Sequence, residues 1–279
     1  MTGENFNETA PMKLRVATHN IHKGLSQFNR RMVVHELRDG LRDIGADIVF
    51  LQEVQGQHHG HARFFHNWPQ APQHEFLADQ VWQDHAYGRN AVYDHGHHGN
   101  AILSRFPILS AENQDVSAHA LERRGILHCI IGLPEEKRLH CLCVHMALTE
   151  RSRRRQTGAL IERMRMLVPA NEPLIVAGDF NDWRNLSGTR LIRETGLAEA
   201  FRDHHGKAAR SFPSVLPLLR LDRIYTRGFA VSHAQVHHGL PWSRISDHAA
   251  LSADIELLPG DLLPGDLLPG DLLPGEHLL

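Results

Sequence analysis

Short apolar runs alternate with longer amphipathic segments between residues 13 and 256, and these two patterns predict strands and helices, respectively. Residues 13–20 (KLRVATHN) alternate apolar and polar positions, which is typical of a strand. Residues 33–44 repeat apolar positions at helical spacing, and Gly45 predicts the end of that helix. Further strands are predicted at residues 47–52, 101–104, 126–132, 139–145, 174–177, 221–226 and 249–255, and a second helix at 153–167.

Many strands with few helices favour two sheets packed face to face with helices outside them. We therefore expect one α+β sandwich domain over residues 13–256, preceded by an N-terminal extension at residues 1–12. Residues 257–279 repeat the unit LLPGD, with proline at a strict spacing of five. Such frequent Pro-Gly pairs suit turns and forbid a continuous helix, so we expect a flexible low-complexity tail. A docking arm that uses the Leu-Leu pairs is the alternative.

The chain is close to electrically neutral, since 30 Lys+Arg and 32 Asp+Glu give a formal net charge of −2. This balance provides no general attraction to nucleic acid. Hydrophobic residues make up 42% and charged residues 22%, which predicts a folded chain. Three cysteines are too few for a disulfide framework, residues 1–12 carry no secretory signal, and no stretch predicts a transmembrane segment. We expect a cytoplasmic protein and leave peripheral membrane contact open.

Polar side chains that can support catalysis recur where predicted strands end or begin. A single Asn or Asp after a strand is usually turn chemistry, but so many together are unlikely to arise by chance. Strand ends that converge would gather oxygen ligands for a hard divalent cation, and imidazoles for proton transfer or phosphate contact. These residues are Asn20, Glu53, His145, Asp179, Asn181, Asp247 and His248.

Six segments carry a family resemblance when they are taken in order. They are THNIHKG around Asn20, LQEV around Glu53, GNAILSRFPI at 99–108, VAGDFND at 176–182, LDRIY at 221–225 and SDHAAL at 246–251. Together they resemble the motif set of the endonuclease/exonuclease/phosphatase superfamily, and within it a small bacterial branch. The resemblance implies a four-layer α/β/β/α sandwich of two packed mixed β-sheets with outer helices. It also implies hydrolysis of a phosphoester with Mg²⁺, for which Mn²⁺ is the alternative ion.

The resemblance implies a metal site and a residue that activates water. Glu53 is similar to the principal metal ligand, with Asn20 beside it and Asp247 completing or sharing the site. Asp179 resembles the carboxylate that orients or deprotonates the attacking water. Asn181 resembles the amide that holds this water and a phosphate oxygen.

Further roles follow from the same resemblance. His248 would contact the phosphoryl group, with Asp222 fixing its tautomer, and His145 would donate a proton to the leaving oxygen or clamp the phosphate. His98, Asn100 and Arg124 match positions that would contact substrate. The residue before Arg124 is an arginine where the family has a proline.

Three other patterns have simpler interpretations. Residues two apart on a strand are about 6.8 Å apart, so Cys141, Cys143 and His145 cannot share one zinc ion, and we expect the cysteines to be core residues. Arg151 and the run 153–155 predict a solvated helix start, with a phosphate-binding patch as the alternative. The chain has 23 His, several in clusters that predict surface loops, some with adventitious metal binding. The cluster before residue 99 is the exception, because the resemblance implies that its loop faces the site. The clusters are His58, His59 and His61; His95, His97 and His98; His204 and His205; and His237 and His238.

These observations favour a phosphodiesterase that acts on a small or lipid-borne phosphodiester by in-line attack of an activated water. A nuclease acting on DNA or RNA is the first alternative, although neutral charge and only 6% aromatic residues do not support it. A catalytically silent binding module is the second alternative. The complete set of acids, amides and imidazoles argues against a silent site.

Overall fold

The computed structural model describes residues 11–26, 31–58, 65, 67–94, 96–119 and 122–259, with the backbone alone at 57 and 58. Several sequence predictions therefore lie outside the described residues. They concern most of the N-terminal extension, the repeat tail from residue 260 onward, His59, His61, His95 and the side chain of His58. None of the described helices is long and apolar enough to cross a membrane.

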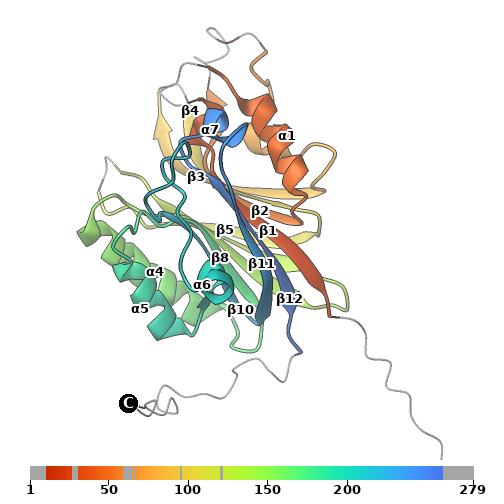
Figure 1. Cartoon of the computed structure of the whole chain (residues 1–279), viewed down its shortest axis with the longest axis vertical. Helices are drawn as coiled ribbons and strands as arrows, with labels where there is room; N and C mark the ends of the chain where they lie inside the picture. Colours follow the sequence, from red (N-terminus) through yellow and green to blue (C-terminus); the bar gives the residue numbers. More distant parts are fainter. Residues whose placement is uncertain are drawn as a thin grey trace, which may run out of the picture.

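Two six-stranded mixed sheets form the centre of the fold, as the sequence predicted (Figure 1). The first sheet has the strand order β11-β12-β1-β2-β4-β3, and the second has the order β5-β6-β7-β8-β10-β9. Strands of the first sheet are β1 (Lys13–Asn20), β2 (Ile48–His58), β3 (Asp84–Tyr93), β4 (Gly96–Ser104), β11 (Phe229–His237) and β12 (Ala250–Leu257). Strands of the second sheet are β5 (Ile108–Asp115), β6 (Gly125–Gly132), β7 (Arg138–His145), β8 (Leu174–Asp179), β9 (Ala198–Glu199) and β10 (Asp222–Arg227).

Helices cover the outer faces of both sheets, with α1 on one side of the sandwich and α4 and α5 on the other (Figure 1). The helices are α1 (Val34–Ile44), α3 (Gln73–Ala78), α4 (Glu150–Leu167), α5 (Leu186–Thr195), α6 (Ala200–His205), α7 (Trp242–Ile245) and the short 3-10 helix η1 (His22–Gly24). The expected four-layer α/β/β/α sandwich is confirmed.

Alternation along the strands produces three hydrophobic layers. Val16 and Phe50 face the second sheet in the central layer, whereas their neighbours Ala17 and Val49 face α1 and α3. Successive strand residues point to opposite faces, so a strand buried on both sides is apolar throughout. A third layer lies between the second sheet and α4 with α5, and contains residues such as Leu142.

The predicted strands are confirmed, but four further strands were missed, namely β3, β5, β9 and β11. β5 is exposed at most positions and carries the polar sequence ILSAENQD, because it is an edge strand that needs little apolar surface. β3 and β11 are also edge strands of their sheet. The prediction that the three cysteines are core residues is confirmed, since all three are free and buried.

Arg153 corrects the prediction of a solvated helix start. Arg151, Arg154 and Arg155 are exposed, but the Arg153 side chain is buried. Its guanidinium donates to the carbonyl oxygen of Ala147 at 3.1 Å and lies 4.7 Å from the centre of the Trp183 ring. Helical spacing places this one arginine of the run on the face of α4 that meets the sheet.

Some histidines also differ from the prediction of surface loops. His97 and His98 lie in β4 and are partly buried, and His237 ends β11. The Tyr87 hydroxyl lies 2.9 Å from His97 Nδ1. Surface loops thus account for only some of the clustered histidines, because several of these residues lie in strands of the first sheet.

The end of β12 predicts how far the chain can be shortened. Leu257 is buried, and its backbone nitrogen donates to Met12 oxygen at 2.9 Å. Truncation after Pro259 should leave the melting temperature within about 2 °C of the full chain. Truncation after Glu256 removes this packing and hydrogen bond, and should cost about 2 kcal/mol, or roughly 4–8 °C. Equal melting temperatures of the two truncated proteins would show that Leu257 contributes little.

Buried imidazoles predict acid sensitivity. Burial lowers the pKa of His74, His128 and His237 to about 4. The unfolded chain then binds more protons than the folded chain between roughly pH 6.5 and pH 4, so stability is lost as pH falls through this range. The melting temperature should fall over this window, and His74→Phe should reduce the fall, because phenylalanine can keep the stacking on Tyr87. His238→Gln, at an exposed position, should leave the pH dependence unchanged.

Candidate catalytic site

The predicted site residues meet at one edge of the sandwich. β1 and β2 are parallel, and β1 ends at Asn20, opposite Gln52 of β2. In the second sheet, β7 and β8 are parallel, and Asp179 is paired in register with His145 on one side. On the other side Asp179 is paired with Asp222, the first residue of the antiparallel strand β10. The ends of β1, β7 and β8, the start of β10 and the Gln52–Glu53 part of β2 therefore lie at the same edge.

A backbone irregularity positions Glu53. The register of β2 against β4 shifts between Leu51 and Val54, and Glu53 has φ +57°. A non-glycine residue in this left-handed region is strained, and bulges of this kind redirect a side chain. Asn20 Nδ2 lies 3.4 Å from Glu53 Oε1. The bulge thus turns a carboxylate toward the end of β1.

Asp179 is the centre of the site. Its Oδ2 accepts a hydrogen bond from Asn20 Nδ2 at 3.1 Å, and lies 3.5 Å from His145 Nε2 and 3.8 Å from His248 Nε2. Its Oδ1 accepts from the backbone nitrogen of Asn181 at 2.9 Å. Burial and the nearby charge of Asp222 raise the pKa of Asp179 to about 6. A carboxylate with such a pKa is ionised at neutral pH but can accept a proton readily.

His248 and Asp222 form a buried pair, in which His248 Nδ1 lies 2.8 Å from Asp222 Oδ2. Burial alone would lower the pKa of His248, but the charges of Asp222 and Asp179 and the hydrogen bond to Asp222 raise it to about 10. The ring is then an imidazolium at neutral pH. By contrast, burial and the nearby charges of Arg124 and His248 hold the pKa of His145 well below its usual range, so this ring is neutral.

Asp247 reaches the site through its neighbours. Ser246 Oγ donates to Asn20 oxygen at 2.7 Å and lies 3.4 Å from Asp247 Oδ1. The same carboxylate oxygen lies 3.5 Å from His22 Nδ1. Ser246 and His22 were not predicted as site residues, although both lie inside the motifs SDHAAL and THNIHKG that indicated Asp247 and Asn20.

Arg124 and Asn181 meet at one carbonyl. Arg124 Nε donates to Met146 oxygen at 3.3 Å, and Asn181 Nδ2 donates to the same atom at 3.0 Å. Arg124 also forms an ion pair with Glu122 at 3.4 Å. This geometry places a guanidinium beside the predicted site even though Arg123 departs from the family pattern.

The two remaining predicted substrate contacts differ in accessibility. His98 is partly buried, and burial lowers its pKa to about 4, with a smaller effect from Lys23. Asn100 is buried, and its Nδ2 donates to the carbonyl oxygens of Gly125 and Cys143 at 3.0 and 3.2 Å. Its Oδ1 has no partner among the described residues. A substrate contact of Asn100 therefore stays a prediction and could use only this oxygen.

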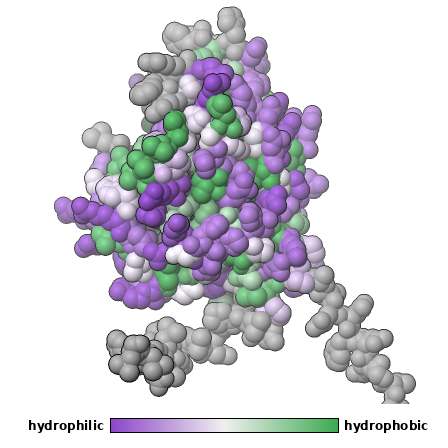
Figure 2. All heavy atoms as spheres, in the orientation of Figure 1, coloured by the Kyte–Doolittle hydropathy of each residue, from purple (hydrophilic) through white to green (hydrophobic). Residues whose placement is uncertain are grey.

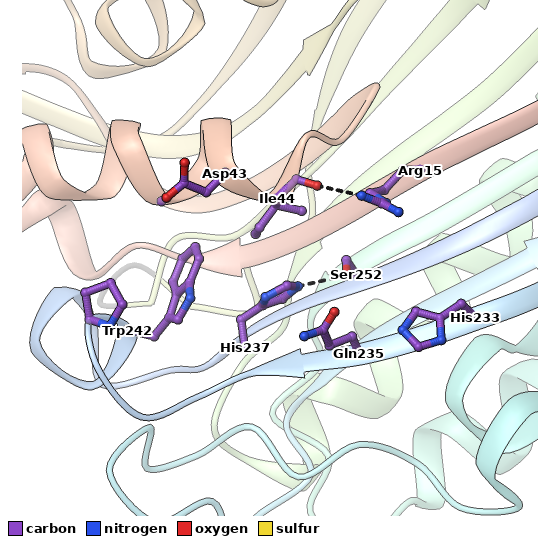
Figure 3. Close-up of a pocket in the computed structure, with 10 residues that line it drawn as sticks. Arg15, Asp43, Ile44, His233, Gln235, His237, Trp242 and Ser252 are labelled. Atoms are coloured by element: carbon purple, nitrogen blue, oxygen red, sulfur yellow. Dashed lines mark hydrogen bonds between the residues drawn. The ribbon is translucent and has the colours of Figure 1, made fainter.

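A separate cavity of about 380 Å³ lies between α1, α7 and the outer face of the first sheet (Figure 3). Its lining includes Arg15, His237 and Trp242, but none of the predicted site residues. Arg15 donates to Ile44 oxygen at 3.1 Å, and His237 Nε2 lies 2.8 Å from Ser252 Oγ. Arg15, His237 and Ser252 of this cavity already have partners, and we assign no catalysis to it.

The chemistry of the donor set fits a hard divalent cation. Glu53, Asp247 and the amide oxygen of Asn20 are oxygen ligands of the kind that Mg²⁺ prefers. Another group, formed by Asp179, Asp222 and His248, places its potential ligand atoms within 4.8 Å of one another. His248 is committed to Asp222 by a hydrogen bond and carries a proton, so this second group fits proton and charge chemistry better than metal binding.

Comparisons with known proteins agree with this architecture. Residues 17–248 match the Endonuclease/Exonuclease/phosphatase family. The chain belongs to this family, whose members are phosphoric ester hydrolases and generally depend on a divalent metal. It is 49% identical over 251 residues to the uncharacterized protein YbhP of Escherichia coli (strain K12). The aligned region covers 90% of this chain and 99% of that protein.

Two solved structures show the same fold. An endonuclease/exonuclease/phosphatase from Beutenbergia cavernae superposes with a TM-score of 0.69, at 18% identity, over 89% of this chain and 72% of that chain. D. rerio TDP2 complexed with a single-strand DNA product superposes with a TM-score of 0.65, at 17% identity, over 87% of this chain and 98% of that chain.

Proposed function

We propose that the protein is a Mg²⁺-dependent phosphodiesterase that hydrolyses a small or lipid-borne phosphodiester by in-line attack of water. The observation that carries the proposal is the arrangement around Asp179. This carboxylate has a pKa of about 6 and lies 3.8 Å from the imidazolium of His248 and 3.5 Å from neutral His145. A carboxylate base, an imidazolium cation and a neutral imidazole donor thus lie close together in the site.

Each group has one role in the proposed reaction. Asp179 orients the attacking water and accepts its proton, which is efficient because its pKa lies near the working pH. Asn181 contacts the same water and a phosphoryl oxygen through its side chain. The His248 imidazolium stabilises the negative charge that builds on the phosphoryl oxygens, and Asp222 holds its orientation. The neutral ring of His145 has one N–H, which it donates to a phosphate oxygen or to the leaving oxygen.

Glu53, Asn20 and Asp247 would hold the metal in this proposal. When bound, Mg²⁺ neutralises charge on the phosphate and orients it, and Mn²⁺ is the alternative ion. We place His98, Asn100 and Arg124 at the substrate. Cytoplasmic location is part of the proposal because the three cysteines are free thiols, which fits a reducing compartment.

A nuclease is the second candidate function. It is favoured by the similarity to TDP2, but at 17% identity that similarity shows the fold alone. The net charge of −2 does not favour a duplex substrate, because a protein that neutralises many phosphates needs a basic stripe.

The experiment that tests the function compares hydrolysis of a chromogenic bis-aryl phosphodiester and its monoester, with Mg²⁺ and in chelator. We expect metal-dependent cleavage of the diester that exceeds cleavage of the monoester. Plasmid DNA, an abasic-site duplex, a glycerophosphodiester and a phospholipid dispersion then define the substrate class. Faster cleavage of DNA than of every other substrate would overturn the proposal in favour of the nuclease.

Glu53→Gln should separate metal binding from the other roles. An amide oxygen lacks the charge that attracts Mg²⁺, so we expect roughly a 100-fold loss of activity at about 1 mM Mg²⁺, and partial recovery at higher concentrations. Isothermal titration with Mg²⁺ measures the affinity directly. Normal affinity together with normal turnover would contradict the assignment of Glu53 as a ligand.

A further inference from the structure

Exposed apolar side chains recur in the segments of the chain that carry the candidate site residues. Eight of the large hydrophobic residues that are exposed within the described part of the chain lie within seven positions of His145, Asn181, Asp222 or Asp247. A monomer gains nothing in stability from apolar groups placed in water, and clusters of them mark interaction sites. The eight exposed residues are Leu148, Trp183, Leu186, Val215, Leu216, Leu218, Leu219 and Leu240.

Half of these residues lie in one segment, residues 211–219, which we call the leucine loop. The site holds its backbone in place: Ser214 nitrogen donates to Asp247 oxygen at 2.7 Å, and Asp222 nitrogen donates to Ser211 Oγ at 3.2 Å. The Phe212 ring lies 5.0 Å from the His248 ring. The loop is therefore anchored on the catalytic residues along one side.

The opposite side of the leucine loop faces solvent. Val215, Leu216 and Leu218 are 66%, 65% and 55% exposed. Where the chain passes from α6 to β10 in Figure 1, Figure 2 shows a ridge of hydrophobic atoms directly beside strongly hydrophilic ones. The apolar ridge is thus fixed at the border of the site and accessible from outside.

Exposed cations occur in the same segments of the chain, and we call the leucine loop together with these cations the rim. Arg184, Lys207, Arg210 and Arg244 are exposed, and none of them forms an ion pair with a carboxylate of the described residues. Next to the leucine loop, a cavity of about 380 Å³ combines the apolar side chains of Phe201, Pro217 and Val236 with Lys207 and Arg210. Apolar surface and unpaired positive charge in one place match an amphiphilic anion.

We propose that this rim docks onto an anionic lipid surface and that the site then takes a headgroup phosphodiester from that surface. Burial of aliphatic side chains at the boundary between headgroups and acyl chains lowers their free energy, and Lys and Arg near the surface are attracted to anionic lipid. Nucleic acid would use the cations but leave the leucines in water. The choice of a lipid ester rests on the proposed function, whereas lipid binding can be measured without turnover.

The test is flotation of the full chain with lipid vesicles in chelator, so that no hydrolysis occurs. Vesicles contain either phosphatidylcholine alone or an equal mixture with phosphatidylglycerol. The rim variant is Leu216→Ser with Leu218→Ser. The matched control is Leu109→Ser with Met166→Ser, which removes two residues of 58% and 72% exposure from other parts of the surface.

We expect the wild type and the control to float with the anionic vesicles, and the rim variant to bind at least tenfold more weakly, since each leucine removed loses apolar burial. Hydrolysis of the bis-aryl phosphodiester should be equal in all three proteins. Absence of wild-type binding, equal binding to both vesicle types, or equal losses in rim and control variants would overturn the proposal.

Two further outcomes are distinguishable. If light scattering shows a wild-type dimer that the rim variant converts to a monomer, and vesicles are not bound, the rim is a protein interface and the lipid proposal is overturned. If vesicles are bound but no phosphodiester is cleaved with Mg²⁺, the docking surface stands and the proposed function fails.

Discussion

Replacing Asp179 by asparagine should lower kcat by about 10³-fold, in the middle of the range that loss of a general base costs. The amide has nearly the same shape, and its single oxygen can still accept from either Asn20 or the Asn181 backbone, but it cannot accept both bonds or take a proton from water. We expect the folded state to be as stable as the wild type or more so. Burial of the ionised carboxylate beside Asp222 is unfavourable, as its raised pKa of about 6 indicates.

Steady-state kinetics on the bis-aryl phosphodiester measure the loss of kcat, and thermal melts measure the stability of Asp179→Asn. Asp182→Asn is the matched control, because Asp182 is also buried but accepts from the backbone nitrogens of Leu186 and Gly188 at the start of α5. It should lose stability, by about 1 kcal/mol, and keep kcat within a few-fold. If Asp179→Asn retained near-normal kcat while its stability changed, Asp179 would be a structural residue.

The second large effect concerns Asp222 and His248, which should behave as a unit. His248→Ala should lower kcat by roughly 10²–10³-fold, because it removes the cation that faces the developing charge. Asp222→Ala should cost nearly as much, since it removes the hydrogen bond at 2.8 Å that orients the ring. The double variant should then lose little more than His248→Ala alone, as expected of groups that share one role.

Fully additive losses in the double-mutant cycle would mean that Asp222 supports the fold or the metal independently of His248. A lower melting temperature of Asp222→Ala would indicate that Asp222 supports the fold. A lower Mg²⁺ affinity of Asp222→Ala would indicate that it supports the metal. Asp222 is completely buried, so kinetics should be interpreted only for variants that fold.

Local pattern was enough to locate most of the core. Apolar spacing predicted α1 and its end at Gly45, where φ is +67°, a conformation that glycine adopts without strain. It predicted α4 three residues too short, because the helix begins at Glu150 after Thr149, whose side chain accepts from Ser152 nitrogen. Both results follow from hydrophobic periodicity, which a sequence displays directly, whereas the cap of α4 lies outside the apolar stripe.

Edge strands carried a weaker signal. β5 is confined to one side of the second sheet and is mostly exposed, so its sequence need not alternate. The interior position of Arg153 was likewise invisible, since an arginine whose charge is satisfied by carbonyls and by Glu150 can be buried without any mark in the local sequence.

The sequence by itself determined which residue types stand at the strand ends, and the order of its motifs indicated the family that residues 17–248 match. Only the tertiary structure decided how these groups meet. The 3.1 Å contact of Asn20 with Asp179 joins residues 159 positions apart, and it forms because the two sheets stack with their strand ends at a common edge. The electrostatics also depend on packing. Burial lowers the pKa of both rings, but the charges of Asp222 and Asp179 raise that of His248 to about 10, whereas burial and the charges of Arg124 and His248 hold that of His145 well below its usual range.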